Sequence, residues 1–164
     1  MPITQDEFRA ALSRFASGVA VVTTKDAAGN LYGITVSAFC SVSLDPPLVL
    51  ICIEKSTGSH FAFQESGIFN VNILSKDQAD LSERFASQIP DKFDRAEISL
   101  NIDGVPLLTG CLAALECRVR QTFDGGDHSI FIGAVERAMI NEGDPLLYFI
   151  GDYREIGGRA ASEN

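Results

Sequence analysis

The chain has 164 residues, of which 46% are hydrophobic, and its formal net charge at pH 7 is −9. A chain of this length can bury about 70% of the surface of its unfolded form, so we expect residues 1–164 to fold as one domain. Its thirteen Lys and Arg residues are scattered, which argues against a nucleic-acid-binding surface. The apolar runs are only as long as strands and the N-terminal residues lack a signal core, so the sequence predicts neither membrane insertion nor secretion and favours a cytoplasmic protein.

The first predicted element is a helix that begins at a capping box. Thr4 and Glu7 have the spacing at which each side chain can bond to the backbone of the other. Phe8, Leu12 and Phe15 then recur at helical intervals, until a Ser-Gly pair at 17–18 ends the run. We expect the apolar side of this helix to pack on a sheet.

A β-hairpin is predicted next. Residues 19–24 form an apolar strand, 26–30 contain turn residues, and 31–39 alternate apolar and polar residues as a returning strand does. The prolines at 46 and 47 interrupt this pattern, and residues 48–53 then form a continuous apolar run typical of a buried strand. The connection between the two strands is rich in serine.

Small hydroxyl side chains gather beside these strand ends. They are Ser37, Ser41 and Ser43 on one side and Ser56, Thr57 and Ser59 on the other. Hydroxyls beside turning backbone are the donors that a phosphate or a ribityl chain needs, and Lys55 adds a cation among them. The segment 33–60 therefore predicts a groove for an anionic ligand. The alternative is that the hydroxyls only cap turns and that Lys55 is solvated.

Helices, strands and turns alternate through the rest of the chain. The pattern predicts a short helix over 59–66 ended by Gly67, a strand over 68–74, and a helix that starts with a capping box at Ser75 and Gln78 and runs to about residue 87. Residues 88–109 mix Pro, Gly, Asp and Asn with single apolar residues and predict irregular surface structure. Three further strands are predicted over 111–123, 129–140 and 146–153.

Strands joined mostly by tight turns favour an antiparallel sheet that curls into a barrel, flanked by helices. The sequence has no G-x-G-x-x-G junction, which argues against a Rossmann domain. The cysteines, at 40, 52, 111 and 117, lack C-x-x-C spacing and lie in apolar contexts, so we expect buried reduced thiols and no metal site. No nucleophile, base and orienting group can be assembled, so no catalytic side chain is predicted.

Several strings of the sequence resemble the flavin reductase-like family, the small reductases that serve two-component flavin monooxygenases. They are FASGVAVVTT at 15–24, GITVSAF at 33–39, SVSLDPPLVLICIEKS at 41–56, GIFNVNILSKDQADLSERFAS at 67–87, GDH at 126–128 and PLLYFIGDY at 145–153. They follow the family's order and spacing and cover nearly the whole chain. The resemblance implies a mainly β fold with flanking helices, a Greek-key split β-barrel of the FMN-binding type, and a homodimer with flavin near the subunit interface.

The resemblance also implies an activity. A family member would transfer a hydride from NADH or NADPH to FMN or FAD and release the reduced flavin to a partner monooxygenase, which free reduced flavin can reach by diffusion. The cofactors supply the reactivity in such a step, so we expect residues that bind and orient the two rings. No basic cluster is placed for the extra phosphate of NADPH, which favours NADH.

The flavin contacts implied by the resemblance fall in three segments. The first comprises Thr35, Val36, Ser37 and Ala38, with Ser41 and Ser43 nearby; the second comprises Cys52, Ile53, Glu54, Lys55, Ser56 and Ser59; the third comprises Ser82, Arg84, Phe85 and Ala86. Ala38 stands where a second Ser is common in the family and Cys40 where Thr is usual, so one hydroxyl contact to the flavin would be missing. Two of these residues have alternative, purely structural roles in place of a flavin contact. Phe85 would be buried in the core, and Ser82 would be a solvated helix residue.

The nicotinamide side is assigned by resemblance to His128, Tyr148 and Tyr153, where His128 would orient the nucleotide through a hydrogen bond. Their alternatives are a solvated turn for the histidine and a sheet surface for the tyrosines. The competing function is a non-enzymatic flavin- or haem-binding split barrel, a carrier or sensor, in which His60, His128 or a cysteine would be the axial ligand of the haem. A purely structural interaction barrel is disfavoured by the clustered hydroxyls.

Overall fold

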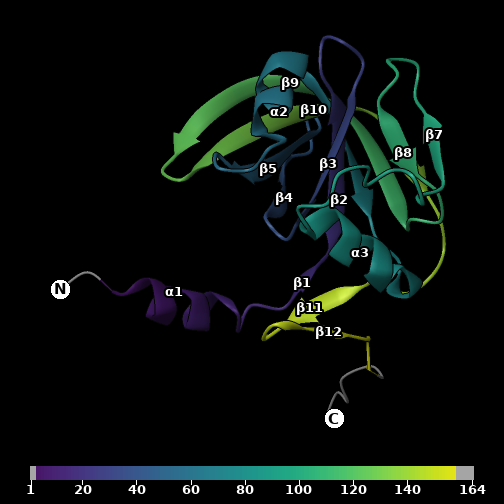
Figure 1. Ribbon diagram of the computed structural model, residues 1–164. Coiled ribbons are helices and arrows are strands. Elements are labelled where there is room, and N and C mark those ends of the chain that lie inside the picture. The colour runs from purple at the N-terminus through teal and green to yellow at the C-terminus, as the bar shows by residue number, and fades with distance from the viewer. Residues whose placement is uncertain (1–2, 158–164) are drawn as a thin grey trace.

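The computed structural model describes residues 3–157 (Figure 1). Strands make up most of its regular structure. In chain order the elements are α1 (Gln5–Leu12), β1 (Ser17–Gly18), β2 (Ala20–Lys25), β3 (Leu31–Val36), β4 (Phe39–Ser43), β5 (Leu48–Glu54), α2 (His60–Ser66), β6 (Ile68–Ile73), η1 (Lys76–Gln78), α3 (Ala79–Ala86), β7 (Ile98–Leu100), β8 (Pro106–Leu108), β9 (Ala113–Gly125), β10 (His128–Ile140), β11 (Leu147–Phe149) and β12 (Asp152–Arg154).

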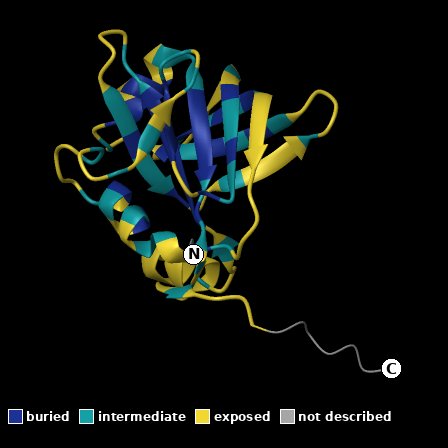
Figure 2. Ribbon diagram, turned by 90° about the vertical axis from the view of Figure 1, so that its right-hand side faces the viewer, coloured by how far each residue is buried: buried dark blue, intermediate teal, exposed yellow. Residues whose placement is uncertain are grey.

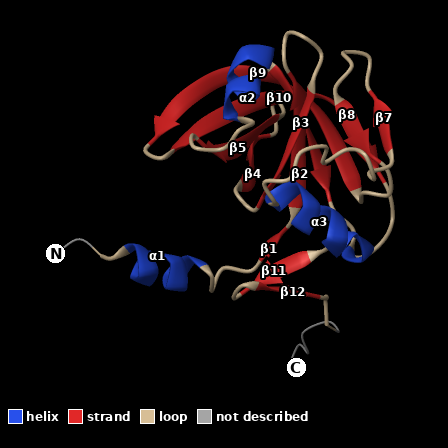
Figure 3. Cartoon of the chain, in the orientation of Figure 1, coloured by secondary structure: helices blue, strands red, loops and turns tan. Residues whose placement is uncertain are grey.

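A seven-stranded antiparallel sheet forms the body of the molecule (Figure 3). Its strand order is β3-β2-β6-β9-β10-β5-β4, and every neighbouring pair is antiparallel. The outer strands β3 and β4 do not pair with each other, so the described strands form an open sheet and no closed barrel. Strands β1, β11 and β12 make a second, small sheet. The prediction of a mainly β, antiparallel protein is confirmed, whereas the split barrel remains a prediction.

Strand β2 is buried on both faces and supplies two core clusters. Ala20 and Val22 point to one face and pack in the cluster that contains Phe131. Val21 points to the other face and packs in the cluster that contains Phe85 of α3. Successive side chains of a strand alternate between faces, so a strand that is apolar throughout can join two clusters. The second cluster is the base on which α3 lies against β2 and β3.

Helix α1 begins at the predicted capping box, in which Thr4 Oγ1 accepts from the Glu7 N–H at 3.2 Å and Glu7 Oε2 accepts from the Thr4 N–H at 2.8 Å. The expectation that this helix packs on a sheet is wrong for the described chain. None of its residues is buried, and Phe8, Leu12 and Phe15 are 54%, 52% and 77% exposed. Figure 1 shows α1 projecting from the body, and Figure 2 shows its exposed surface. The residue spacing specifies an apolar side, but it does not specify what covers that side.

The other two helices have the predicted ends. Helix α2 stops at Gly67, whose φ of +68° is a left-handed conformation that glycine adopts without strain. The capping box at Ser75 and Gln78 is formed and opens one turn of 3₁₀ helix, η1, which continues as α3. Both predictions rest on local backbone chemistry, and both are confirmed.

Three predicted segments differ from the structure. The serine-rich connection after β3 is itself a strand, β4, which pairs with β5. The segment 88–109 contains the hairpin β7–β8, and Asn70 Nδ2 fixes it to the large sheet by donating to Pro106 O at 3.0 Å. The strand predicted over 146–153 is the hairpin β11–β12, because Ile150 and Gly151 have φ values of +51° and +78°, which two-residue hairpin turns require.

The cysteines are all free thiols, as expected. Cys111 and Cys117 are buried, and Cys52 is partly buried. Cys40 is exposed, which corrects its predicted burial, since it lies on the edge strand β4. No helix of residues 3–157 is long and apolar enough to cross a membrane.

Candidate functional site

A groove of about 790 Å³ opens beside β3, the connection from β5 to α2, and the segment that follows α3. Its volume lies within the range of small-molecule sites. The lining residues are 30–35, Glu54, 57–59 and 86–94. The groove therefore joins parts of all three segments to which the flavin contacts are assigned by resemblance.

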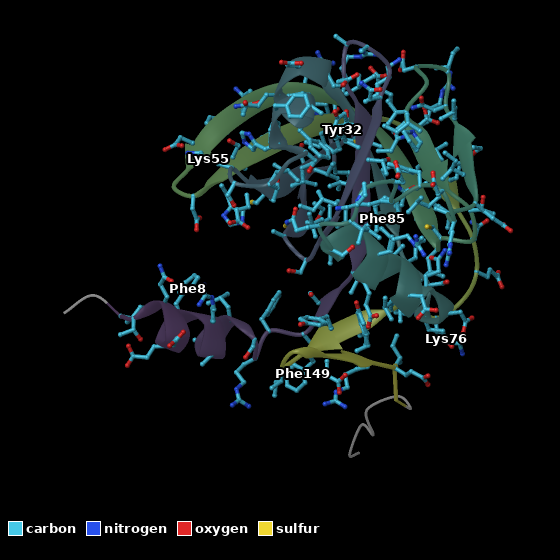
Figure 4. The ribbon with its side chains drawn as sticks, in the orientation of Figure 1. Phe8, Tyr32, Lys55, Lys76, Phe85 and Phe149 are labelled. Carbon is cyan, nitrogen blue, oxygen red and sulfur yellow. The ribbon has the colours of Figure 1, made fainter. Side chains whose placement is uncertain are left out.

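Close contact between β3 and α3 builds one wall of this groove. A Cβ atom on Gly33 would lie 2.6 Å from Phe85 Cε1 and 3.2 Å from Phe93 Cζ, so only glycine leaves room for these rings. The side chain of Phe85 is fully buried, and its ring meets Phe93 edge to face at 5.0 Å between centroids. Figure 4 shows Phe85 between the helix and the sheet. This packing holds the end of α3 and the following segment beside β3.

A chain of hydrogen bonds links the same wall to the C-terminal hairpin. Thr35 Oγ1, on β3, donates to Ser82 O at 2.6 Å, and Tyr153 OH, on β12, donates to Ser82 Oγ at 2.9 Å. Ser82 is 1% exposed, so both bonds are shielded from water at its end. Buried polar groups cost stability when they are unpaired, so this chain ties three elements together.

The segment 87–94 closes the outer side of the groove. Its Lys92 Nζ donates to Phe85 O at 2.9 Å and to Gly33 O at 3.4 Å, which links the segment to both α3 and β3. Burial lowers the pKa of the Lys92 ammonium from its ordinary value. Sequence reasoning missed Lys92, because Pro, Asp and Lys in succession are typical of a solvated loop. The one signal was that long irregular segments often carry function.

The connection from β5 to α2 forms the opposite wall. Ser59 is buried and lines the groove, and Ser56 Oγ donates to Glu54 Oε1 at 2.6 Å. Lys55 points out of the groove, since its Nζ donates to Gly126 O at 2.6 Å and forms an ion pair with Asp124. The hydrogen bond and the charge of Lys55 lower the pKa of Asp124.

The two histidines lie at neighbouring positions near the start of β10. His128 is its first residue, and His60, on α2, contacts the second residue, Ser129. His128 begins β10 directly across from Glu54, a groove residue, and its Nδ1 lies 2.7 Å from Asp127 Oδ1. The hydrogen bond and the charge of His128 lower the pKa of Asp127. His60 is almost fully buried, with its Nε2 2.9 Å from Ser129 Oγ. No group of three His, Cys, Asp or Glu in residues 3–157 is arranged to hold a metal ion.

The structure distributes the predicted site residues over four places. Those that line the groove are Thr35, Glu54, Ser59 and Ala86. Those buried beside or beneath it are Val36, Ile53, Ser82 and Phe85. Those that neither line the groove nor are buried are Arg84, on α3, and Ser37, Ala38, Ser41, Ser43, Cys52, Lys55, Ser56 and His128, on strands and turns. Tyr148 and Tyr153 lie on the C-terminal hairpin, with ring centroids 5.7 Å apart.

The groove also contains aromatic and apolar residues that the sequence did not reveal as site residues. Tyr32 and Ile34 line it from β3, and Phe93 lines it from the segment after α3. Tyr32 packs edge to face on Phe61 of α2 at 5.1 Å. The alternation of β3 had indicated that one of its faces is buried, but not that part of this face lines a cavity. Polar donors facing a partly apolar wall suit a flat conjugated ring with a polar chain.

Comparison with known proteins adds a family and named relatives. A profile of the flavin reductase like domain matches residues 12–157. The chain is 45% identical over 146 residues to the FMN reductase (NADH) SmoA of Agrobacterium fabrum. The aligned region covers 89% of this chain and 83% of SmoA. It is 41% identical over 150 residues to the reductase subunit HsaB of a flavin-dependent monooxygenase of Rhodococcus jostii, covering 91% and 76%.

A solved structure agrees with these relatives. The NADH:FAD oxidoreductase SgcE6 of Streptomyces globisporus C-1027, in complex with NAD and FAD fragments, superimposes with a TM-score of 0.87 at 34% identity, covering 98% of this chain and all of SgcE6. The chain spans about half the length of another relative, a "probable flavin reductase" of Rhizobium meliloti that is 41% identical over 157 residues.

Proposed function

We propose, because this chain belongs to the flavin reductase-like family, that it is an NADH-dependent flavin reductase. It reduces FMN or FAD and supplies the reduced flavin to a partner monooxygenase. The observation that carries this function is the groove, in which residues 30–35, Glu54, 57–59 and 86–94 line one cavity of suitable size. Relatives named as an FMN reductase (NADH) and as a monooxygenase reductase subunit support both the activity and the partner.

When both nucleotides are bound, NADH supplies the hydride and the oxidised flavin accepts it, so the protein needs no acid, base or nucleophile of its own. The task of the chain is to hold two flat rings in contact and to keep water away. Strand β3 offers a rigid wall with Tyr32 and Ile34, and α3 fixes that wall through the Gly33–Phe85 contact. Thr57 and Ser59 supply small polar groups opposite it.

The residues of the nicotinamide side are also part of the proposal. His128 is held by Asp127 and stands across from Glu54 at the groove, which supports a role in orienting the dinucleotide. Tyr148 and Tyr153 form an edge-to-face pair on the C-terminal hairpin. The groove contributes no cluster of cations that would select the extra phosphate of NADPH, which supports NADH.

The assembly state and the cell compartment belong to the proposal as well. We infer a homodimer of one-domain subunits, and the projecting apolar side of α1, with Phe8, Leu12 and Phe15, supports a second copy as its cover. A split barrel in each subunit is consistent with the open, seven-stranded sheet. Four free thiols and the supply of NADH support the cytoplasm.

The decisive experiment uses a catalytic amount of protein. The purified protein is mixed without oxygen with excess FMN and NADH, and the loss of the visible absorbance of the flavin is followed, then repeated with FAD, riboflavin and NADPH. We expect many turnovers, faster with NADH than with NADPH. Flavin binding without any bleaching would overturn the reductase and favour a carrier or sensor, and a Soret band in the purified protein would favour haem.

A further inference from the structure

The groove carries an unusual balance of charge for a nucleotide site. Among the described residues that line it, the acidic side chains are Glu54, Asp91 and Asp94, and the single basic side chain is Lys92. FMN and FAD are anions because of their phosphates, so a groove with three carboxylates needs a cation where the phosphate lies. Lys92 is the lining residue with the required charge.

The ammonium of Lys92 is held by the backbone. Its Nζ donates to Phe85 O, near the C-terminal end of α3, and to Gly33 O of β3. Both acceptors are main-chain oxygens of packed elements, so the position of the nitrogen is fixed before any ligand arrives. An ammonium has three N–H donors, and these two bonds leave one for the groove.

Lys55, the cation that the sequence favoured, is engaged elsewhere. Its Nζ forms an ion pair with Asp124 and donates to Gly126 O, and it is not among the residues that line the groove. If Lys55 turned into the groove, it would lose both of its contacts with the β9–β10 hairpin, to Asp124 and to Gly126 O. Lys92 keeps both of its backbone contacts while it faces the groove.

We propose that Lys92 binds the phosphate of the flavin nucleotide, as a cation already positioned by α3 and β3. The inference rests on the proposed function only in taking a flavin nucleotide as the ligand. A phosphate oxygen accepts the third N–H, and the negative charge offsets the desolvation of the half-buried ammonium. Charge-assisted bonds of this kind are stronger where water is partly excluded. Lys92 has two tasks, because the same nitrogen also fixes the segment 87–94 to the groove wall.

The test compares FMN with riboflavin, which has the same ring and ribityl chain but no phosphate. Dissociation constants are measured by quenching of flavin fluorescence, without NADH. In Lys92→Met we expect FMN to bind about 10- to 100-fold more weakly, which is the effect of losing one charge-assisted hydrogen bond, while riboflavin binding changes less than about threefold. Lys92→Arg keeps the charge and should recover most of the affinity for FMN.

A matched control is Lys76→Met. Lys76 precedes α3, whereas Lys92 follows it, and its Nζ pairs with Asp144 at 3.0 Å on the surface (Figure 4). This variant removes the same charge and should leave both flavins bound as in the parent. Equal losses of FMN and riboflavin in Lys92→Met would overturn the phosphate contact and leave only the role in fixing the segment 87–94. Unchanged FMN binding would overturn it as well.

A second readout needs no variant that could misfold. The second ionisation of a free phosphate monoester has a pKa of about 6, and a bound cation lowers it. The ³¹P resonance of FMN bound to the parent protein should therefore report a lower phosphate pKa than that of free FMN. An unchanged phosphate pKa would contradict the proposal. None of these measurements depends on turnover, so a protein that binds FMN through Lys92 but does not bleach it would refute the reductase and leave the phosphate contact standing.

Discussion

The groove wall and the outlying elements of this molecule differ in how far one chain completes them. The wall consists of α3, β3 and the segment 87–94, and in it Phe85 is fully buried and Ser82 is 1% exposed. The outlying elements are α1, without a buried residue, and the end of the β9–β10 hairpin, where residues 120–127 are all exposed. The wall is stabilised by contacts within the chain, whereas the outlying elements expose apolar side chains such as Phe8 and Phe123 that no described residue covers.

The largest effect is expected from a substitution in the core of the groove wall. Phe85→Ala removes a fully buried ring and leaves a cavity between α3 and β3, so we expect a loss of about 3–5 kcal/mol in the free energy of unfolding. Because the contact lies within one chain, the loss should be the same at high and low protein concentration. Urea denaturation at two concentrations measures this. A loss that depends on concentration would mean that the wall is completed by the partner.

The opposite behaviour is expected of α1. Replacing Phe8, Leu12 and Phe15 together by Ser removes its apolar side, which makes no buried contact in the described chain. We expect the parent to sediment as a dimer and the triple variant as a monomer, with a thermal midpoint that differs from that of the parent only at high protein concentration. A variant that still sediments as a dimer would show that α1 is not the interface.

His128 tests the turn end of the β9–β10 hairpin, where it pairs with Gly125. His128→Ala should raise the KM for NADH about tenfold and change the dissociation constant of FMN by less than twofold, because the imidazole stands across from Glu54 beside the groove without lining it. Steady-state kinetics and fluorescence quenching provide the two values. Asp127→Asn should have a smaller effect in the same direction, since it only loosens the imidazole.

Tyr153→Phe separates packing from hydrogen bonding in the wall. It keeps the ring beside Tyr148 and removes the bond to Ser82 Oγ, so we expect a loss of about 1 kcal/mol in the free energy of unfolding. The KM for flavin should rise two- to threefold, because Ser82 also holds Thr35 through its carbonyl. No change in the free energy of unfolding would indicate that a water molecule takes the place of the Tyr153 hydroxyl as the partner of Ser82 Oγ.

The smallest effect on stability concerns the thiols. Burial raises the pKa of Cys111 to about 11 and of Cys117 to about 12, so at pH 8 both remain protonated, and the thiolate is the reactive form. Iodoacetamide should therefore label Cys40, on the exposed edge strand, long before either of them. Mass spectrometry of the native and the urea-unfolded protein distinguishes the sites. Early labelling of Cys117 would indicate that the core opens locally.

The sequence predicted the elements whose signals are local. The capping boxes at Thr4 and Ser75 and the left-handed Gly67 depend on backbone bonds within a few residues, and all are present. The sequence did not predict what covers α1, because an apolar side is compatible with any apolar partner. The β7–β8 hairpin was missed because Asn70, a distant residue, fixes it.

The candidate site was predicted unevenly for the same reason. Strand alternation and serine clusters located two of the segments that meet at the groove. The choice between Lys55 and Lys92 depends on which carbonyls and carboxylates lie nearby in space, and the nearest acid to Lys55 in the folded chain is Asp124, 69 residues away in sequence. A local pattern cannot contain that information.

The pairing of β1 with β11 has a consequence for how the protein is made. Ser17 leaves the ribosome early, but its partner Tyr148 is synthesised about 130 residues later. The bond from Tyr153 to Ser82 forms later still, so the nascent chain carries an incomplete groove wall until residue 153 has been synthesised. A product of premature termination before residue 147 would lack β11 and β12 altogether. It would expose the partners of these strands to proteases and chaperones, so the β11–β12 hairpin distinguishes chains that extend past residue 153 from shorter fragments.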